Sequence, residues 1–221
     1  MRTLIVNFKN YREVLGDGSL RLASAAAKVA SGSSHEIVVA PPAAMLGAVA
    51  SKVLIPVFSQ SLSVQTGEMT TGADQPEAAR AAGAVGTLLN HSEARMRQAE
   101  LEGLVPRVKK AGLKVCICAS GTREASALSV LRPEYIAVEP TELIGTGVAV
   151  SRARPEVVEA TVKSARKAGY RGRVLCGAGI VSGEDVKRAV ELGADGVLVS
   201  SSVVKARDWA SKIGELARSL D

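Results

Sequence analysis

Glu139 stands at the end of a short apolar run and directly before a segment bounded by proline and glycine. The run is 135–138, and the segment is 140–147, with Pro140 at one end and Gly147 at the other. A carboxylate at the mouth of a buried strand, next to such a loop, is typical of a general base beneath a movable lid. The sequence therefore predicts proton abstraction at this position, in a site that the loop closes.

Two other strand ends carry polar side chains that would complement a base. Asn7 and Lys9 close the first apolar run, and His91 follows the run that ends at Leu89. A base, a neutral hydrogen-bond donor and a cation together suit proton transfer next to the carbonyl group of an anionic substrate. Each residue also has a simpler interpretation: Glu139 as an ion-paired carboxylate, His91 as a core histidine and Lys9 as a surface lysine.

The elements that must position these residues repeat along the whole chain. Eight short apolar runs alternate with alanine-rich helical patterns, at 4–6, 37–40, 55–58, 85–89, 113–118, 135–138, 173–176 and 196–199. The runs are continuously apolar, which is typical of parallel strands covered on both faces. Eight β-α units without a linker favour a single α/β domain over residues 1–221, a closed (β/α)8 TIM barrel. The alternative is an open doubly wound sheet.

Local signals mark several helix boundaries. Asp74 is the predicted N-cap of the third helix, with Glu77 as its capping partner, and Ser182 precedes an acidic first turn. Four glycines follow helical runs, as expected just beyond a helix C-terminus. These glycines are Gly83, Gly112, Gly169 and Gly193.

Two of the units leave little room for a helix. The segments 40–59 and 118–139 are the short ones, so the second and fifth helices must be brief. Short helices leave part of an apolar barrel wall uncovered, and such a wall usually contacts a partner subunit. We therefore expect a homo-oligomer.

Composition excludes several classes of protein. Hydrophobic residues make up 47% and charged residues 23% of the 221 residues, which predicts a full core. The net charge of +6 is spread over helices without a basic run that contains aromatic residues, which disfavours a nucleic-acid groove, so we expect no nucleic-acid partner. No apolar stretch approaches membrane length and no signal peptide is recognisable, so we expect a cytoplasmic protein. The spacing of Cys116, Cys118 and Cys176 fits neither a redox pair nor a zinc site, and favours buried thiols.

Several short motifs occur in an order that is characteristic of one family. They are Asn7-Phe8-Lys9, Asn90-His91-Ser92-Glu93, Glu139-Pro140, Ile144-Gly145-Thr146-Gly147 and Cys176-Gly177-Ala178-Gly179-Ile180. With this ordered set the chain resembles the triosephosphate isomerase family, in its short archaeal form, over nearly its whole length. The resemblance implies interconversion of dihydroxyacetone phosphate and D-glyceraldehyde 3-phosphate through an enediolate, in glycolysis and gluconeogenesis, with no cofactor and no metal.

The resemblance also implies roles for the polar strand ends. Glu139 would move the carbon-bound proton, and Lys9, oriented by Asn7, would hold the substrate by its charge. His91 would shuttle a proton between the substrate oxygens. A helical pattern follows His91 within a few residues, and a helix N-terminus disfavours an added positive charge, so we expect its imidazole to stay neutral.

Further positions match contacts to the substrate in that family. Backbone N–H groups of the lid and of the last two loops would hold the phosphate, although the glycines there can equally be turn residues. The matching positions are Phe8, Ile144, Gly145, Gly179, Ser200 and Ser201. The long loop 60–71 enters the neighbouring subunit's site in relatives, although by itself it is only a polar loop. We expect the homo-oligomer to be a homotetramer, with a homodimer as the alternative.

Three segments depart from the broader family. The lid tip reads Thr141-Glu142-Leu143, the eighth strand ends in Ser200-Ser201-Ser202, and the fifth strand continues into Ala119-Ser120-Gly121. Long-form relatives have a Gly-Glu pair at the last position, so we expect a polar contact to be missing there. Two other functions remain open: a different phosphate-binding barrel enzyme, and a non-catalytic phosphate-binding protein.

Overall fold

The computed structural model describes residues 1–140, 143, 147 and 149–221. Eight strands in this part of the chain form one sheet, and every pair of neighbours is parallel. They are β1 (Thr3–Asn7), β2 (Glu36–Ala40), β3 (Phe58–Ser59), β4 (Gly86–Leu89), β5 (Lys114–Ala119), β6 (Tyr135–Val138), β7 (Arg173–Cys176) and β8 (Gly196–Val199).

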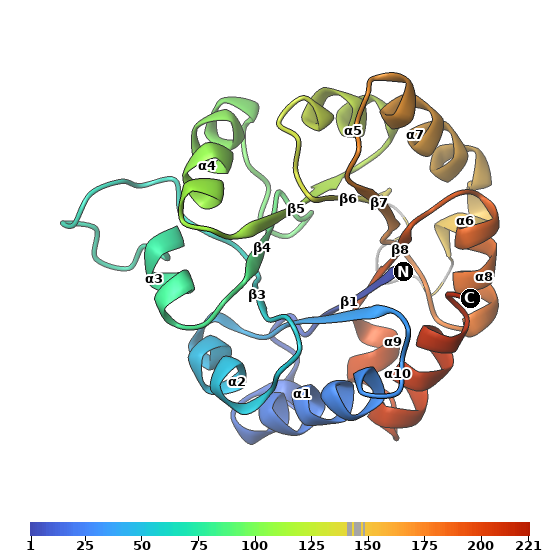
Figure 1. Cartoon of the computed structure of the whole chain (residues 1–221), viewed down its shortest axis with the longest axis horizontal. Coiled ribbons are helices and arrows are strands. Elements are labelled where there is room, and N and C mark those ends of the chain that lie inside the picture. Colours follow the sequence, from blue (N-terminus) through green and yellow to red (C-terminus); the bar gives the residue numbers. More distant parts are fainter. Residues whose placement is uncertain (141–142, 144–146, 148) are drawn as a thin grey trace.

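The sheet curls into a barrel. Its order is β2-β1-β8-β7-β6-β5-β4-β3, and a bridge between Val39 and Val57 joins the two ends of that order. Figure 1 shows the strands as an inner ring with helices arranged around it. The predicted (β/α)8 barrel is confirmed, and the alternative of an open doubly wound sheet is wrong.

Helices cover the outside of the ring. Those in the described residues are α1 (Asp17–Ala30), α2 (Leu46–Lys52), α3 (Pro76–Ala81), α4 (Gln98–Lys110), α5 (Thr122–Ser129), α6 (Val150–Ala153), α7 (Pro155–Lys167), α8 (Gly183–Glu191), α9 (Ser201–Val204) and α10 (Trp209–Arg218). None of these helices is long and apolar enough to cross a membrane.

The predicted short helices are present, and a third one was missed. α2 has 7 residues and α5 has 8, as the short units require. α3 has only 6 residues, because the connection from β3 runs to residue 75 and projects from the barrel (Figure 1).

Most helix boundaries follow their local signals. Ser182 is the N-cap of α8 in a capping box with Asp185. The four predicted glycines follow helices with positive φ, from 77° to 97°. The prediction for Asp74 is wrong, because Gln75 is the N-cap of α3 and the backbone of Asp74 pairs with Ser63 across the base of the long connection. This pairing fixes Asp74 outside the helix.

The third strand also differs from its prediction. The apolar run begins at Ile55, whereas β3 contains only Phe58 and Ser59. Pro56 has no backbone N–H for a sheet ladder, although its carbonyl accepts a hydrogen bond from Val39 at 3.1 Å. Phe58 fills the barrel interior instead, where a Cβ on Gly86 would lie 2.4 Å from its ring.

Two apolar layers result from the alternation of side chains along the strands. The inner layer lies inside the barrel and consists of Ile5, Val38, Ala40, Phe58, Leu88, Cys116, Cys118, Tyr135, Ala137, Leu175 and Leu198. The outer layer packs between strands and helices. Cys116 and Cys118 share one face, as predicted, and all three cysteines are buried free thiols. The filled interior leaves the carboxyl ends of the strands as the place for a site.

Candidate active site

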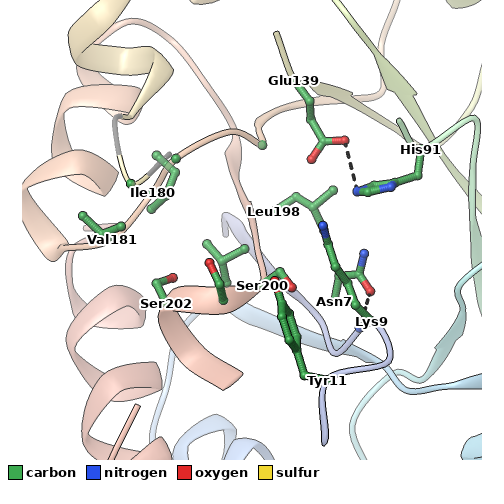
Figure 2. Close-up of a pocket in the computed structure, with 15 residues that line it drawn as sticks. Asn7, Lys9, Tyr11, His91, Glu139, Ile180, Val181, Leu198, Ser200 and Ser202 are labelled. Atoms are coloured by element: carbon green, nitrogen blue, oxygen red, sulfur yellow. Dashed lines mark hydrogen bonds and ion pairs between the residues drawn. The ribbon is translucent and has the colours of Figure 1, made fainter. Parts of the chain in front are cut away.

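The residues predicted to act together converge at the carboxyl end of the barrel. Asn7 and Lys9 come from the end of β1, His91 from beyond β4, and Glu139 from the residue after β6. Figure 2 shows their side chains around one cavity, with Ser200 and Ser202 from the end of β8 on another side. Residues 132 positions apart in the chain are thereby brought into one site, since Asn7 and Glu139 both line it.

Glu139 is a buried carboxylate with an unused oxygen. Its side chain is 5% exposed, and Oε2 has no hydrogen-bond partner among the described residues. Burial raises the pKa of Glu139 to about 7, against the opposing effects of a hydrogen bond from Cys118 and the charge of Lys9. Such a carboxylate holds a proton well enough to act as a base near neutral pH.

The lack of a side chain at Gly177 makes room for the side chain of Glu139. A Cβ on Gly177 would lie 2.4 Å from Cγ of Glu139, so any other residue there would displace the carboxylate. The backbone N–H of Glu139 donates to Ala119 at 2.8 Å, and Gly177 donates to Val138 at 3.0 Å. The strand ladder therefore continues past β6 on both sides and holds the base in place.

His91 faces Glu139 in a defined tautomer. Its Nδ1 accepts a hydrogen bond from the backbone N–H of Glu93 at 3.2 Å, which leaves the proton on Nε2. Nε2 lies 3.8 Å from Oε2 of Glu139, the contact drawn in Figure 2. This distance exceeds a hydrogen bond, so both groups keep their capacity for a substrate.

The imidazole is held neutral by a cause other than the one predicted. Burial and the nearby charge of Lys9 lower the pKa of His91, while Glu93 opposes them. The expected helix N-terminus is not adjacent, because α4 begins only at Gln98. Burial, rather than the predicted helix dipole, therefore keeps the imidazole of His91 neutral.

Lys9 is fixed in an unusual backbone conformation. Its φ is +49°, and its N–H donates to Oδ1 of Asn7 at 3.0 Å. Gln60 donates to the carbonyl of Lys9 at 3.1 Å and to that of Ala40 at 2.9 Å. Nζ of Lys9 forms an ion pair with Glu93 at 2.7 Å. These contacts place the ammonium group over the cavity.

The end of β8 supplies further polar groups. The hydroxyl oxygens of Ser200 and Ser202 are buried and have no hydrogen-bond partner in the part of the chain that the structure describes. Gly179 lines the same cavity and has a φ of +70°. Unused donors lining a cavity next to a lysine suit an anionic group.

The remaining predicted positions divide into three groups. Gly179, Ser200 and Ser201 line the cavity, as does Gly147. Ile144 and Gly145 lie outside the described residues, together with most of the predicted lid. The side chain of Phe8 is fully buried in the outer apolar layer and does not line the cavity, which favours a packing role over substrate contact.

Other cavity and supporting residues escaped sequence reasoning. Tyr11 and Ser202 line the cavity beside predicted residues, so their proximity in sequence was the available signal. Glu93, which belongs to a family motif but was given no role of its own, pairs with Lys9. After β5, Glu124 of α5 accepts hydrogen bonds from Ser120 and Asn90, so a carboxylate reaches that loop from the helix. The contacts of Lys9 with Glu93 and of Asn90 with Glu124 join residues far apart in the chain, so no local sequence pattern marks them.

A metal site is not formed by the described residues, among which no group of three or more His, Cys, Asp or Glu side chains is suitably placed. The arrangement is instead that of a proton-transfer site. It has a buried base, a neutral imidazole N–H and a fixed lysine at the carboxyl end of a (β/α)8 barrel. Fold and site together define a barrel protein built for acid–base chemistry on a small anion.

Comparison with known proteins specifies the family. The model of the family described as triosephosphate isomerase matches residues 2–216. A triosephosphate isomerase of Methanocaldococcus jannaschii is 43% identical over 215 residues, which cover 97% of this chain and 98% of the relative. One of Methanosarcina barkeri is 43% identical, with 97% of both chains covered, and one of Caldivirga maquilingensis is 43% identical over 217 residues, with 98% of this chain and 96% of the relative covered. The chain belongs to the triosephosphate isomerase family, and the resemblance to its archaeal members is confirmed.

Proposed function

We propose that this protein interconverts dihydroxyacetone phosphate and D-glyceraldehyde 3-phosphate, the triose phosphate step of glycolysis and gluconeogenesis. The observation that carries the proposal is the pairing at 3.8 Å of a buried carboxylate, which has an unused oxygen, with a neutral imidazole N–H. Membership of the triosephosphate isomerase family supports the same reaction.

Glu139 carries the proton between the two carbons. Its carboxylate removes a proton from C1 of dihydroxyacetone phosphate, and the electron pair of that bond moves to form the enediolate. The resulting carboxylic acid then returns a proton to C2, which yields the aldehyde. The pKa of about 7 suits both steps, because the group accepts and releases a proton near neutral pH.

His91 serves the two oxygens of the same intermediate. Its Nε2–H donates to the carbonyl oxygen as negative charge develops there, and the proton moves between O2 and O1 of the enediolate. A neutral imidazole suits this role, since its lowered pKa keeps the ring uncharged before the substrate arrives.

Lys9 and the end of β8 hold the anion. The ammonium group of Lys9 stabilises charge on the substrate oxygens and phosphate. The unused hydroxyls of Ser200 and Ser202 support phosphate binding at the opposite wall of the cavity, beside Gly179 and Ser201. The predicted lid at 141–147 excludes water and prevents loss of phosphate from the enediolate.

We further propose a homotetramer in the cytoplasm, with a homodimer as the alternative assembly. Three barrel units that carry a single short α-helix support self-association, because α2, α3 and α5 have 8 residues or fewer and no longer α-helix accompanies them. Two large apolar side chains, Leu54 and Met69, are fully exposed in the single chain. A mass measurement in solution separates tetramer, dimer and monomer.

The function is tested by adding dihydroxyacetone phosphate and measuring glyceraldehyde 3-phosphate in a coupled assay, in H2O and in D2O. In D2O the product should carry deuterium at C2, because a carboxyl group exchanges its proton with solvent during the transfer. No conversion would identify a different barrel enzyme or a non-catalytic phosphate-binding protein. Conversion without deuterium would overturn the role of Glu139 as a proton carrier.

A further inference from the structure

Glu124, in the first turn of α5, joins two loops that lead to the catalytic pair. One carboxylate oxygen, Oε1, accepts a hydrogen bond from Nδ2 of Asn90 at 3.1 Å and forms a close ion pair with Arg95. The other, Oε2, accepts from the backbone N–H of Ser120 at 2.7 Å and from its hydroxyl at 2.8 Å. Both oxygens are therefore fully used, each toward a different loop.

The first connection leads to His91. Asn90 immediately precedes it and has φ of +60°, a conformation that needs support in a residue other than glycine. The amide of Asn90 also donates to the carbonyl of Cys118 at 2.9 Å, and its Oδ1 accepts from Met96 at 3.0 Å. The guanidinium group of Arg95 also donates a hydrogen bond to the backbone carbonyl of Asn90 at 3.3 Å. Glu124 thus anchors the turn from which the imidazole projects.

The second connection leads to Glu139. Ser120 directly follows Ala119, the last residue of β5, and the carbonyl of Ala119 accepts from the N–H of Glu139 at 2.8 Å. The buried thiol of Cys118, the residue before Ala119, is near enough to Glu139 to lower the pKa of its carboxyl group. The loop held by Oε2 of Glu124 is therefore the one against which the base is seated.

A carboxylate is the group that can make both connections. Four donors point at it, and an ionised carboxyl group accepts through both oxygens at once. Burial alone would raise the pKa of Glu124, but the hydrogen bonds from Arg95 and Ser120 outweigh burial and keep the pKa low. The group stays charged over the working pH range.

We propose that Glu124 is a positioning residue for the isomerisation: it sets the distance between His91 and Glu139 by tying the loops after β4 and β5 together. This inference rests on the proposed function. It also explains how the chain compensates for Ser120-Gly121 after β5, because the carboxylate reaches that loop from the helix.

A purely structural role is the competing explanation, since Glu124 is an acidic residue in a first helical turn and stabilises α5 there. The matched control is Glu156, which occupies the first turn of α7 and pairs with Arg154 rather than with either loop. Glu156→Ala removes the same kind of helix interaction. It should leave kcat unchanged.

The main variant is Glu124→Ala. We expect kcat to fall by about tenfold, because small misplacements of catalytic groups are costly, while KM changes by less than about twofold. Glu124→Gln keeps one acceptor oxygen and should lose only about threefold. An unchanged kcat in Glu124→Ala, or a rise in KM that accounts for the whole loss, would overturn the proposal.

A double variant separates positioning from stability. In a His91→Gln background, Glu124→Ala should cost much less than tenfold in kcat, because only the seating of Glu139 then remains to be disturbed. A further tenfold loss there would show that Glu124 acts by another route. The midpoint of thermal unfolding, measured for all variants, reports any structural effect separately.

A readout independent of activity uses the two histidines of the chain. In a protein labelled with 15N-histidine, Glu124→Ala should shift the imidazole signals of His91 and leave those of His35, which pairs with Asp221, unchanged. Unshifted His91 signals would overturn the proposal even in an active enzyme. If the wild type does not convert dihydroxyacetone phosphate, the proposed function fails, and the signals still decide whether Glu124 holds His91.

Discussion

Two glutamates at opposite ends of the same barrel show how partners decide the use of a buried carboxylate. Glu36 opens β2 at the amino end, and Glu139 follows β6 at the carboxyl end. Their side chains are 11% and 5% exposed, and Glu139 is the more deeply buried of the two. Burial would raise the pKa of either carboxyl group, so the opposite shifts of the two pKa values also depend on their partners.

Glu36 is surrounded by donors. Oε2 accepts from Arg173 at 2.7 Å, from Tyr135 at 2.8 Å and from Thr3 at 3.1 Å, and Oε1 pairs with Lys114 at 3.3 Å. Burial alone would raise the pKa of Glu36, but these hydrogen bonds and charges outweigh it and hold the pKa below its ordinary value. In this cluster at the amino end of the barrel, both carboxylate oxygens of Glu36 have hydrogen-bond or ion-pair partners.

Glu139 lacks such partners. One oxygen has no donor among the described residues, and burial raises its pKa to about 7. An unsatisfied buried carboxylate costs stability, so its place at the site is consistent with a role that needs the free oxygen. In this barrel, Glu36 at the amino end is paired with donors and stabilises the fold, whereas Glu139 at the carboxyl end keeps an unpaired oxygen that is available to a substrate.

The largest expected effect is on turnover. Glu139→Gln should lower kcat by about 10²–10⁴-fold, because an amide cannot accept the proton. Glu36→Gln should change kcat by less than about threefold in the same coupled assay. Circular dichroism serves as the control for folding. Loss of turnover in both variants would remove the distinction between the two ends.

The two lysines near these carboxylates offer a second contrast. Lys9→Ala should reduce kcat/KM by an amount equivalent to about 2–4 kcal/mol, because the lost charge faces the substrate in a sheltered cavity. Inhibition by a phosphate-bearing analogue should weaken in parallel. Lys114→Ala, at the amino end, should leave both unchanged, and an equal loss in the two variants would contradict the contrast.

The raised pKa of Glu139 predicts a dependence of stability on pH. Because its pKa rises from 4.5 to about 7 on folding, the stability of the protonated form is present below 4.5 and is lost as pH rises through about 7. Glu139→Gln does not titrate and avoids this loss, so it should gain up to about 3 kcal/mol relative to wild type.

Urea unfolding at about pH 5 and about pH 8.5 measures this gain. The advantage of Glu139→Gln should be small at the lower pH and largest at the higher pH. An advantage that is independent of pH would mean that the carboxyl group is not titrating near neutrality in the folded protein.

Glu36→Ala should have the smallest effect of the variants compared so far, and it should change only the free energy of unfolding. Removing the carboxylate leaves Tyr135 and Arg173 without their acceptor, which should cost about 2 kcal/mol in the free energy of unfolding. Glu159→Ala, which breaks an exposed ion pair with Lys163, should cost less than about 0.5 kcal/mol. Equal losses of unfolding free energy in the two variants would show that the cluster around Glu36 stabilises the protein no more than an exposed ion pair does.

Much of the fold could be predicted because its signals are local. Continuous apolar runs mark parallel strands, and glycine or serine marks helix ends such as Gly112 and Ser182, since these features depend on neighbouring residues. The predictions failed where a distant segment intervened: Ser63 holds Asp74 outside α3, and the ring of Phe58 occupies the interior beside Gly86.

The sequence by itself determined which side chains meet, because parallel strands in a barrel end at one face and Lys9, His91 and Glu139 each follow a strand. Only the tertiary structure decided their chemical state. The pKa of Glu139 depends on a dry environment built from strands far apart in the chain, and the lowered pKa of His91 depends on burial and on the charge of Lys9, 82 positions away. Solvation and hydrogen-bond partners are properties of the packed molecule, so no local pattern can contain them.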